Sequence, residues 1–278
     1  MRTNTAGARK FLMPVRRTIL HSYQTLHLFN HYFGPKIALL IRKTFRTGEY
    51  TNFTYDLAEK NLRYLAHTIS LVTGRPVDEI TRFIQEPRDD VLLKEHLNRS
   101  LSEHGLPQRR DIECVFGRRL GWYALARITR PRVIIETGVD KGHGSILLCA
   151  ALLRNASEGH PGKYFGLDIA PTAGWLLSGE YSRVGEIVYG DSIQSLKNFG
   201  GDIDMFINDS DHSADYELRE YQAIHAKLSA HAIILGDNAH ATDRLCKFSE
   251  QMGRRFIFFR EEPADHWYPG AGIGISFN

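Results

Sequence analysis

Two acidic motifs could carry chemistry in this chain, because each closes a predicted buried strand. Asp209 ends the predicted strand 204–209, and Asp237 ends the predicted strand 232–237, with Asn238 next to it. Parallel strands end at one edge of a sheet, so we expect these side chains to converge. Two carboxylates and an amide supply the oxygen ligands that an octahedral Mg²⁺ site accepts. Either motif alone fits a solvated acid at a strand end, whereas the pair favours a magnesium site.

A glycine-containing turn after the apolar run 133–135 predicts a cofactor site. Gly138, Gly142 and Gly144 lie between this run and a helix-like stretch that begins at Ser145, which places free backbone N–H groups at a strand end. A dinucleotide fingerprint requires a glycine where this chain has Asp140, so a pyrophosphate fits poorly. The alternative is an ordinary strand, turn and helix without a ligand.

Two further acids follow the next predicted strands and bear on the identity of the cofactor. Asp168 ends the second strand, where a carboxylate can accept hydrogen bonds from both ribose hydroxyls. Asp191 and Ser192 follow the third strand, where they could contact an adenine or form a plain turn. These positions support an adenosine cofactor without distinguishing S-adenosylmethionine (SAM) from NAD.

Alternating strands and helices must position these residues. We expect five strands that alternate with helices from the run at Val133 onward, at 133–135, 163–168, 186–191, 204–209 and 232–237. This alternation predicts a doubly wound α/β fold with a parallel sheet. Two last strands at 255–260 and 272–277 have only a loop between them, so they should form an antiparallel hairpin.

From about residue 112 onward, the chain resembles the class I SAM-dependent methyltransferases. The acid-x-Gly-x-x-x-Gly pattern from Glu136 to Gly142, the terminal hairpin and the two acidic strand ends carry the resemblance. More narrowly, it is similar to the metal-dependent O-methyltransferases related to catechol O-methyltransferase and to the enzymes that methylate natural-product sugars. The resemblance implies a Rossmann-like seven-stranded sheet, SAM as methyl donor and Mg²⁺ held by Asp209, Asp237 and Asn238.

The resemblance also implies roles for individual residues. The implied SAM contacts are Glu136, Thr137, Gly138, Asp140, Gly142, Gly144, Asp168, Ile169, Asp191, Ser192 and Asp209. His212 lies three residues after Asp209, where catechol O-methyltransferase has a lysine that acts as general base. Because an imidazole titrates near neutrality, His212 could take a proton from the acceptor hydroxyl, although it could equally bind the metal or donate a hydrogen bond. Arg118 and Arg119 could reach the cofactor carboxylate, but solvated arginines on an amphipathic helix fit better.

Charge and composition divide the 278 residues into three predicted parts. These are a basic arm at 1–50, an α-helical cap or dimerisation region at 51–110, and a SAM-binding methyltransferase domain at 111–278. Nine basic residues and no acid precede Glu49, which leaves 26 basic residues against 32 acids in the rest of the chain. Three distant cysteines suit buried thiols in a reducing compartment. No stretch resembles a membrane span or a signal peptide, so we expect a cytoplasmic protein.

The predicted function is an Mg²⁺-dependent O-methylation of a sugar, polyol or phenol. Two alternatives stay open: another SAM-using reaction, such as N-methylation or an intramolecular attack on the sulfonium carbons, or a non-catalytic binding module. A dehydrogenase is disfavoured by Asp140 and by the terminal hairpin. For partners we expect a small-molecule acceptor and a homo-oligomer formed through the N-terminal helices. We expect no nucleic acid, and at most weak contact of the basic arm with a membrane surface.

Overall fold

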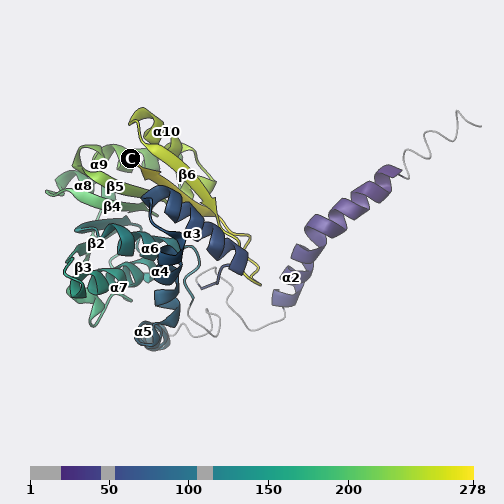
Figure 1. Cartoon of the computed structure of the whole chain (residues 1–278), viewed down its shortest axis with the longest axis horizontal. Helices are drawn as coiled ribbons and strands as arrows, with labels where there is room; N and C mark the ends of the chain where they lie inside the picture. Colours follow the sequence, from purple (N-terminus) through teal and green to yellow (C-terminus); the bar gives the residue numbers. More distant parts are fainter. Residues whose placement is uncertain (1–19, 45–53, 105–114) are drawn as a thin grey trace, which may run out of the picture. The chain divides into compact units, whose positions relative to one another are not determined.

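A seven-stranded sheet organises the C-terminal part of the computed structural model (Figure 1). The structure describes residues 20–44, 54–104 and 115–278, with the backbone alone at 42–44 and 238. The strand order is β3-β2-β1-β4-β5-β7-β6, in which β1 to β5 are parallel and β7 is antiparallel to both of its neighbours. The strands are β1 Val133–Thr137, β2 Lys163–Asp168, β3 Gly185–Tyr189, β4 Ile203–Asn208, β5 Leu228–Gly236, β6 Arg255–Arg260 and β7 Gly272–Phe277. The predicted doubly wound sheet with a terminal hairpin is confirmed.

Helices cover both faces of this sheet (Figure 1). The hydrophobic cluster on one face contains residues of α3 Glu59–Thr73, α4 Val77–Asp89, α5 Val91–Glu103, α6 Arg119–Thr129 and α7 His143–Ser157, and the cluster on the other face contains residues of α8 Ser192–Asn198, α9 Ala214–Ile224 and α10 Arg244–Gln251. Successive strand residues face opposite sides, so Ile134 joins the first hydrophobic cluster and Ile135 the second. Burial on both faces explains why these strands are apolar runs without alternation.

Helices α3 to α5 belong to the same hydrophobic cluster as α6, α7 and one face of the sheet. Both predicted domain boundaries, near residues 50 and 110, fall outside the described residues, so the division into arm, cap and methyltransferase domain stays a prediction. Helix α4 contains Pro87 and continues to Asp89. A proline in the last turn lets a helix continue for only a few more residues. Asp90 separates α4 from α5 and caps the start of α5, because its carboxylate accepts from the Leu93 N–H at 3.0 Å.

Residues 20–44 form a helical segment that is described by itself. A π-helical turn at Phe29–Phe33 leads into α2 Gly34–Thr44. The large side chains Leu26, Phe33 and Ile37 are exposed. The expected oligomer contacts and the weak membrane-surface contact of this arm stay predictions. Within the described ranges, the helices lack the length and apolarity that a membrane crossing requires.

Candidate active site

A cavity of about 1180 Å³ opens along the carboxyl ends of the parallel strands. It lies where the strand order reverses between β1 and β4, which is the usual ligand position in such sheets. Single-ligand pockets commonly measure roughly 300–1,000 Å³, so a cofactor and an acceptor have room here together. The predicted site residues that line it are Glu136, Gly138, Asp140, Gly144, Asp168, Ile169, Asp191, Ser192, Asp209, His212 and Asp237.

Two predicted site residues, Thr137 and Gly142, are not among those that line the cavity, and a third, Asn238, is described by its backbone alone. The Thr137 side chain is buried, and its hydroxyl donates to Glu220 Oε2 at 3.0 Å. Gly142 has a φ of +95° at the start of α7, and a Cβ there would lie 3.2 Å from Gly174. The Asn238 side chain lies outside the described part of the chain, so its predicted metal contact stays a prediction.

The glycine loop after β1 interlocks with the loop after β4. Gly138 has a φ of +78°, and a Cβ on it would lie 2.0 Å from the Asp209 carbonyl oxygen. The Gly138 N–H donates to the Leu167 carbonyl at 2.9 Å, and the Asp209 N–H donates to the Thr137 carbonyl at 2.9 Å. Glycine is therefore required at position 138 both for its backbone angle and for this close approach.

Asp168 holds the turn of this loop through backbone donors. Its carboxylate accepts from the N–H groups of Val139 at 2.8 Å, Asp140 at 3.0 Å and Ala170 at 2.8 Å. Asp140 adopts a φ of +49°, which aspartate tolerates better than most residues. The Asp168 side chain is half-buried and lines the cavity, so an oxygen that still has a lone pair can face a ribose hydroxyl.

Asp209 and Asp237 come together, as the sequence predicts. Each lies one residue beyond its strand, and their carboxyl groups are hydrogen-bonded to each other. Burial, followed by the neighbouring charge of Asp237, holds the pKa of Asp209 well above its usual value. Burial opposes ionisation of Asp237 as well, but the Arg118 charge and its hydrogen bonds outweigh it and hold the pKa of Asp237 below its usual value. The two neighbouring carboxyl groups therefore differ in acidity, with Asp237 ionising more readily than Asp209.

Arg118 is the partner of this pair, a role that sequence reasoning missed. Its Nη2 donates to Asp237 Oδ2 at 2.7 Å, and its Nε donates to Asp237 Oδ1. The two side chains are only 7% and 5% exposed. Across the part of the chain that the structure describes, no group of three or more His, Cys, Asp or Glu side chains could hold a metal ion. Because Arg118 takes both oxygens of Asp237, the residues in this arrangement do not fit Mg²⁺.

Arg119, the next residue, lines the same cavity but differs from Arg118 in its contacts. Its guanidinium lies 5.5 Å from the centre of the Trp122 ring, in cation–π contact. Its buried Nε has no hydrogen-bond partner among the described residues, and no ion pair of Arg119 is found among them. A half-buried cation on the cavity wall that forms no salt bridge among the described residues can receive a carboxylate from a ligand.

Glu136 is a buried acid beneath the glycine loop. The Tyr164 hydroxyl donates to its Oε2 at 2.5 Å, and Ser145 Oγ donates to the same oxygen at 3.3 Å. Burial raises the pKa of Glu136 to about 7, although the Tyr164 hydrogen bond and the Arg119 charge lower it. A Cβ at Gly144 would lie 2.3 Å from Glu136 Oε1, so this glycine provides the space for the carboxyl group.

Glu220 on α9 ties three strand ends together and was not foreseen. Its buried carboxylate accepts from Thr137 at 3.0 Å and Ser210 at 2.8 Å, and also from Asn208 and Ser192. A signal existed in the sequence: positions 217, 220, 221 and 224 share one helix face, and two of them are glutamates among core residues. Carboxylates on a buried helix face require donors, and those donors come from the loops that form the cavity.

Two histidines stand at the acidic side of the cavity. His212 and His240 both line it, and both are exposed. The His240 Nδ1 lies 3.1 Å from the Asp237 carbonyl oxygen, which orients its ring. Both imidazoles are therefore within the same cavity as the cofactor loop.

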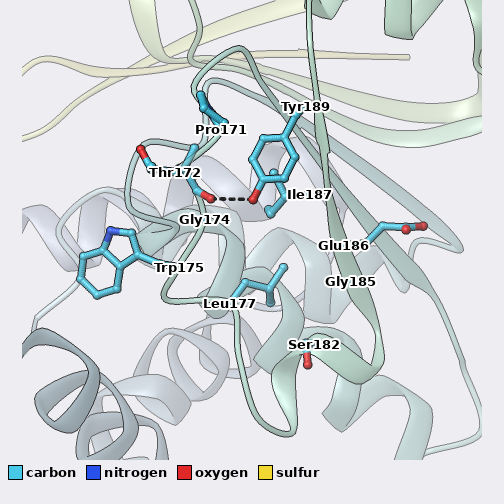
Figure 2. A pocket seen from close by; sticks show the side chains of 11 residues that line it. Pro171, Thr172, Gly174, Trp175, Leu177, Ser182, Gly185, Glu186, Ile187 and Tyr189 are labelled. Atoms are coloured by element: carbon cyan, nitrogen blue, oxygen red, sulfur yellow. Dashed lines mark hydrogen bonds between the residues drawn. The ribbon is translucent and has the colours of Figure 1, made fainter. Parts of the chain in front are cut away.

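A second hollow of about 470 Å³ lies beside the first, between the 171–177 loop and β3. Figure 2 shows the Tyr189 ring directed toward this loop, where its hydroxyl donates to the Ala173 carbonyl at 3.1 Å. Thr172, Ala173 and Trp175 line both hollows. Because the two hollows share these residues, we describe the second one as an extension of the main cavity. Its described lining residues do not include an acid, a base and a nucleophile together.

Comparison of the sequence with known protein families indicates which kind of domain surrounds the cavity. Residues 135–239 match the family model of a methyltransferase domain. The match runs from within β1 to the residues just after β5, which are the elements that surround the cavity. Residues 135–239 therefore form a methyltransferase domain.

Several solved structures, among them three from bacteria, are similar to this chain. A methyltransferase from Geobacter sulfurreducens is 18% identical over 68% of this chain and 90% of that chain, with a TM-score of 0.45. The O-methyltransferase TomG from Streptomyces achromogenes, involved in tomaymycin synthesis and solved in complex with SAM, is 15% identical over 80% and 98%, with a TM-score of 0.46. An O-methyltransferase from Bacillus cereus in complex with SAH is 16% identical over 79% and 99%, with a TM-score of 0.46. Such identities concern the fold and leave acceptor and metal open. No curated protein sequence matches this chain.

Proposed function

We propose that this enzyme transfers the methyl group of SAM to a hydroxyl group of a small molecule, namely a sugar, polyol or phenol. One observation carries the proposal: the glycine loop and Asp168 share a single cavity with Asp209, Asp237 and two histidines. The first group suits a nucleoside cofactor, and the second supplies acid–base groups at the same strand edge. A cavity of about 1180 Å³ has room for both substrates.

The proposed reaction assigns the proton to His212. The acceptor O–H gives its proton to the imidazole, the oxygen forms a bond to the methyl carbon, and the methyl–sulfur bond breaks with its electron pair left on sulfur. The products are a methyl ether and S-adenosylhomocysteine. The enzyme contributes mainly by holding the two reacting atoms in line and in contact.

We assign different protein residues to the neutral ribose and to the charged carboxylate of SAM. Asp168 accepts from the ribose hydroxyls, in place of or beside its present backbone donors. Arg119 takes the methionyl carboxylate of SAM, because it is the cavity-lining arginine that forms no salt bridge among the described residues. Glu136 and Gly144 support the loop from below.

The predicted Mg²⁺ has no step in this proposal. Asp209 and Asp237 converge as a metal site requires, but Arg118 donates hydrogen bonds to both oxygens of Asp237. The Mg²⁺ dependence that the sequence predicts is therefore no part of the proposed reaction, and chelation tests this.

The test begins with SAM binding and continues to the products. Calorimetry should detect SAM and S-adenosylhomocysteine, and incubation with a panel of polyols, sugars and phenols should convert SAM to S-adenosylhomocysteine. His212→Gln should lower turnover by about 10²- to 10⁴-fold and leave SAM affinity unchanged, since a general base acts only in the chemical step. His240→Gln is the matched control in the same cavity and should lower turnover less. Methylthioadenosine as product, or NAD binding without SAM binding, would overturn the proposal.

A further inference from the structure

Arg118 stands where the sequence predicts a metal ion. Its guanidinium faces the Asp237 carboxylate with two parallel donors, Nε and Nη2, of which the second lies 2.7 Å from Oδ2. Asp237 is in turn hydrogen-bonded to Asp209. A planar guanidinium satisfies a carboxylate edge in a bidentate way, which directs a single positive charge at the same oxygens that a cation would bind.

The guanidinium is held from its other side as well. Arg118 Nη1 donates to the Tyr55 hydroxyl at 2.7 Å and lies 3.4 Å from Glu261 Oε1. Glu261 is itself anchored by the Tyr55 hydroxyl at 2.6 Å and the Ala271 N–H at 2.7 Å. The Glu261 side chain is fully buried, so none of these contacts is exchanged for water at low cost.

The backbone beside Arg118 is adapted to this arrangement. Gly117 has a φ of +52°, and a Cβ on it would lie 2.4 Å from the Tyr55 ring. Glycine thus lets Tyr55 pack against the start of α6 and reach Arg118. The Arg118 guanidinium, just before α6, therefore joins a residue before α3, a residue after β5 and a residue after β6.

We propose that Arg118 is a positioning residue that takes the place of a divalent metal, so that methyl transfer proceeds without bound Mg²⁺. Arg118 acts through Asp237: it fixes this carboxylate and neutralises its charge at the edge of the acceptor space. The inference rests on the proposed methyl transfer for its role in turnover, whereas the exclusion of metal can be measured on the protein alone.

Metal binding by the cofactor-free protein is the first test. Titration of the wild-type protein with Mn²⁺, followed by electron paramagnetic resonance, should detect no bound ion that Mg²⁺ displaces. EDTA should leave the conversion of SAM to S-adenosylhomocysteine unchanged. A stoichiometric Mn²⁺ site that Mg²⁺ competes for, or activity lost in EDTA and restored by Mg²⁺, would overturn the proposal. Failure to bind SAM would instead reject the proposed function and leave the Mn²⁺ titration valid.

Three arginine variants make the test specific. Arg118→Ala leaves the two acids without their cation, so Mg²⁺ should now raise the melting temperature in a concentration-dependent way. Arg127→Ala removes a buried arginine of the same helix, paired with Glu86 at 2.8 Å away from the cavity, and should lose stability without any response to Mg²⁺. Arg119→Ala should weaken SAM binding, again without a response to metal. An Arg118→Ala protein that folds and ignores Mg²⁺ would show that Arg118 does not fill a metal position.

Discussion

The two ends of the cavity hold their carboxylates in opposite ways. At the loop end, which consists of Gly138, Asp140 and Asp168, the Asp168 carboxylate is half-buried and accepts only backbone N–H groups. At the acid end, which consists of Arg118, Asp209 and Asp237, the carboxylates are paired with each other and with a buried guanidinium. A carboxylate held by neutral donors beside solvent can exchange them for a ligand, whereas a buried ion pair cannot be opened cheaply. The loop end is therefore built to bind and release, and the acid end to stay in place.

The largest effect is expected when the Asp237 carboxylate is removed from the acid end. Asp237→Ala would remove the carboxylate that accepts two hydrogen bonds from the buried Arg118 guanidinium. Removing one partner of a buried pair costs about 3–5 kcal/mol, so we expect a loss of this size in urea denaturation, together with loss of activity. Asp237→Asn, which keeps the shape but not the charge, should lose less. A variant as stable as wild type would mean that the acid end is as open as the loop end.

The contact between the two ends is the next target. Gly138→Ala places a Cβ 2.0 Å from the Asp209 carbonyl oxygen, which is backbone and cannot turn away. Gly159→Ala is the matched control, because its φ of +89° is also positive but nothing lies within 4 Å of the added Cβ. Both substitutions strain the backbone, and Gly138→Ala should cost about 1–3 kcal/mol more, as measured by denaturation. Equal losses would show that the loops after β1 and β4 can move apart freely.

A smaller effect is expected at the loop end. Asp168→Ala should weaken SAM binding about 10- to 150-fold in calorimetry, since a hydrogen bond to a charged group contributes roughly 1.5–3 kcal/mol. Its cost in stability should stay well below that of Asp237→Ala, because the backbone donors that it releases lie close to solvent. Asp168→Asn keeps one acceptor oxygen and should retain part of the affinity. A large loss of stability with unchanged SAM affinity would reverse the roles of the two ends.

These ends also differ in how far the sequence predicts them. The loop end depends on local signals: Gly138 and Asp168 follow apolar runs, and strands 163–168, 255–260 and 272–277 have the bounds that those runs predict. The acid end depends on which distant residues meet. The sequence brings Asp209 and Asp237 to one edge, but Arg118 lies 119 positions before Asp237, and its direction depends on the rotation of α6 and on Tyr55. The hydrophobic periodicity of the sequence predicts an amphipathic helix beside Arg118. It does not distinguish an arginine in solvent from one that is buried and paired with a carboxylate.

The smallest expected effect is a pH dependence of stability that comes from Glu136, beneath the loop end. Burial raises the pKa of Glu136 to about 7 from an ordinary value near 4.5, so the folded state holds this proton more tightly than the unfolded state does. Its contribution to stability is fully present below about pH 4.5 and is lost as the pH rises to about 7, with a slope on the order of 1 kcal/mol per pH unit. Glu136→Gln removes this slope, so the stability of the variant relative to wild type should increase between pH 5 and pH 8 in urea denaturation.

Two comparisons isolate this effect to Glu136. Asp209, whose pKa is also raised, contributes a slope of the same sign to both proteins and therefore cancels in the difference. Glu186→Gln removes a negative charge from an exposed position on β3 and controls for the change in net charge. A constant difference between Glu136→Gln and wild type across this range would mean that Glu136 is already ionised in the folded state. The loop end would then contain a buried charge, as the acid end does, and the contrast between the two ends would lie only in Arg118.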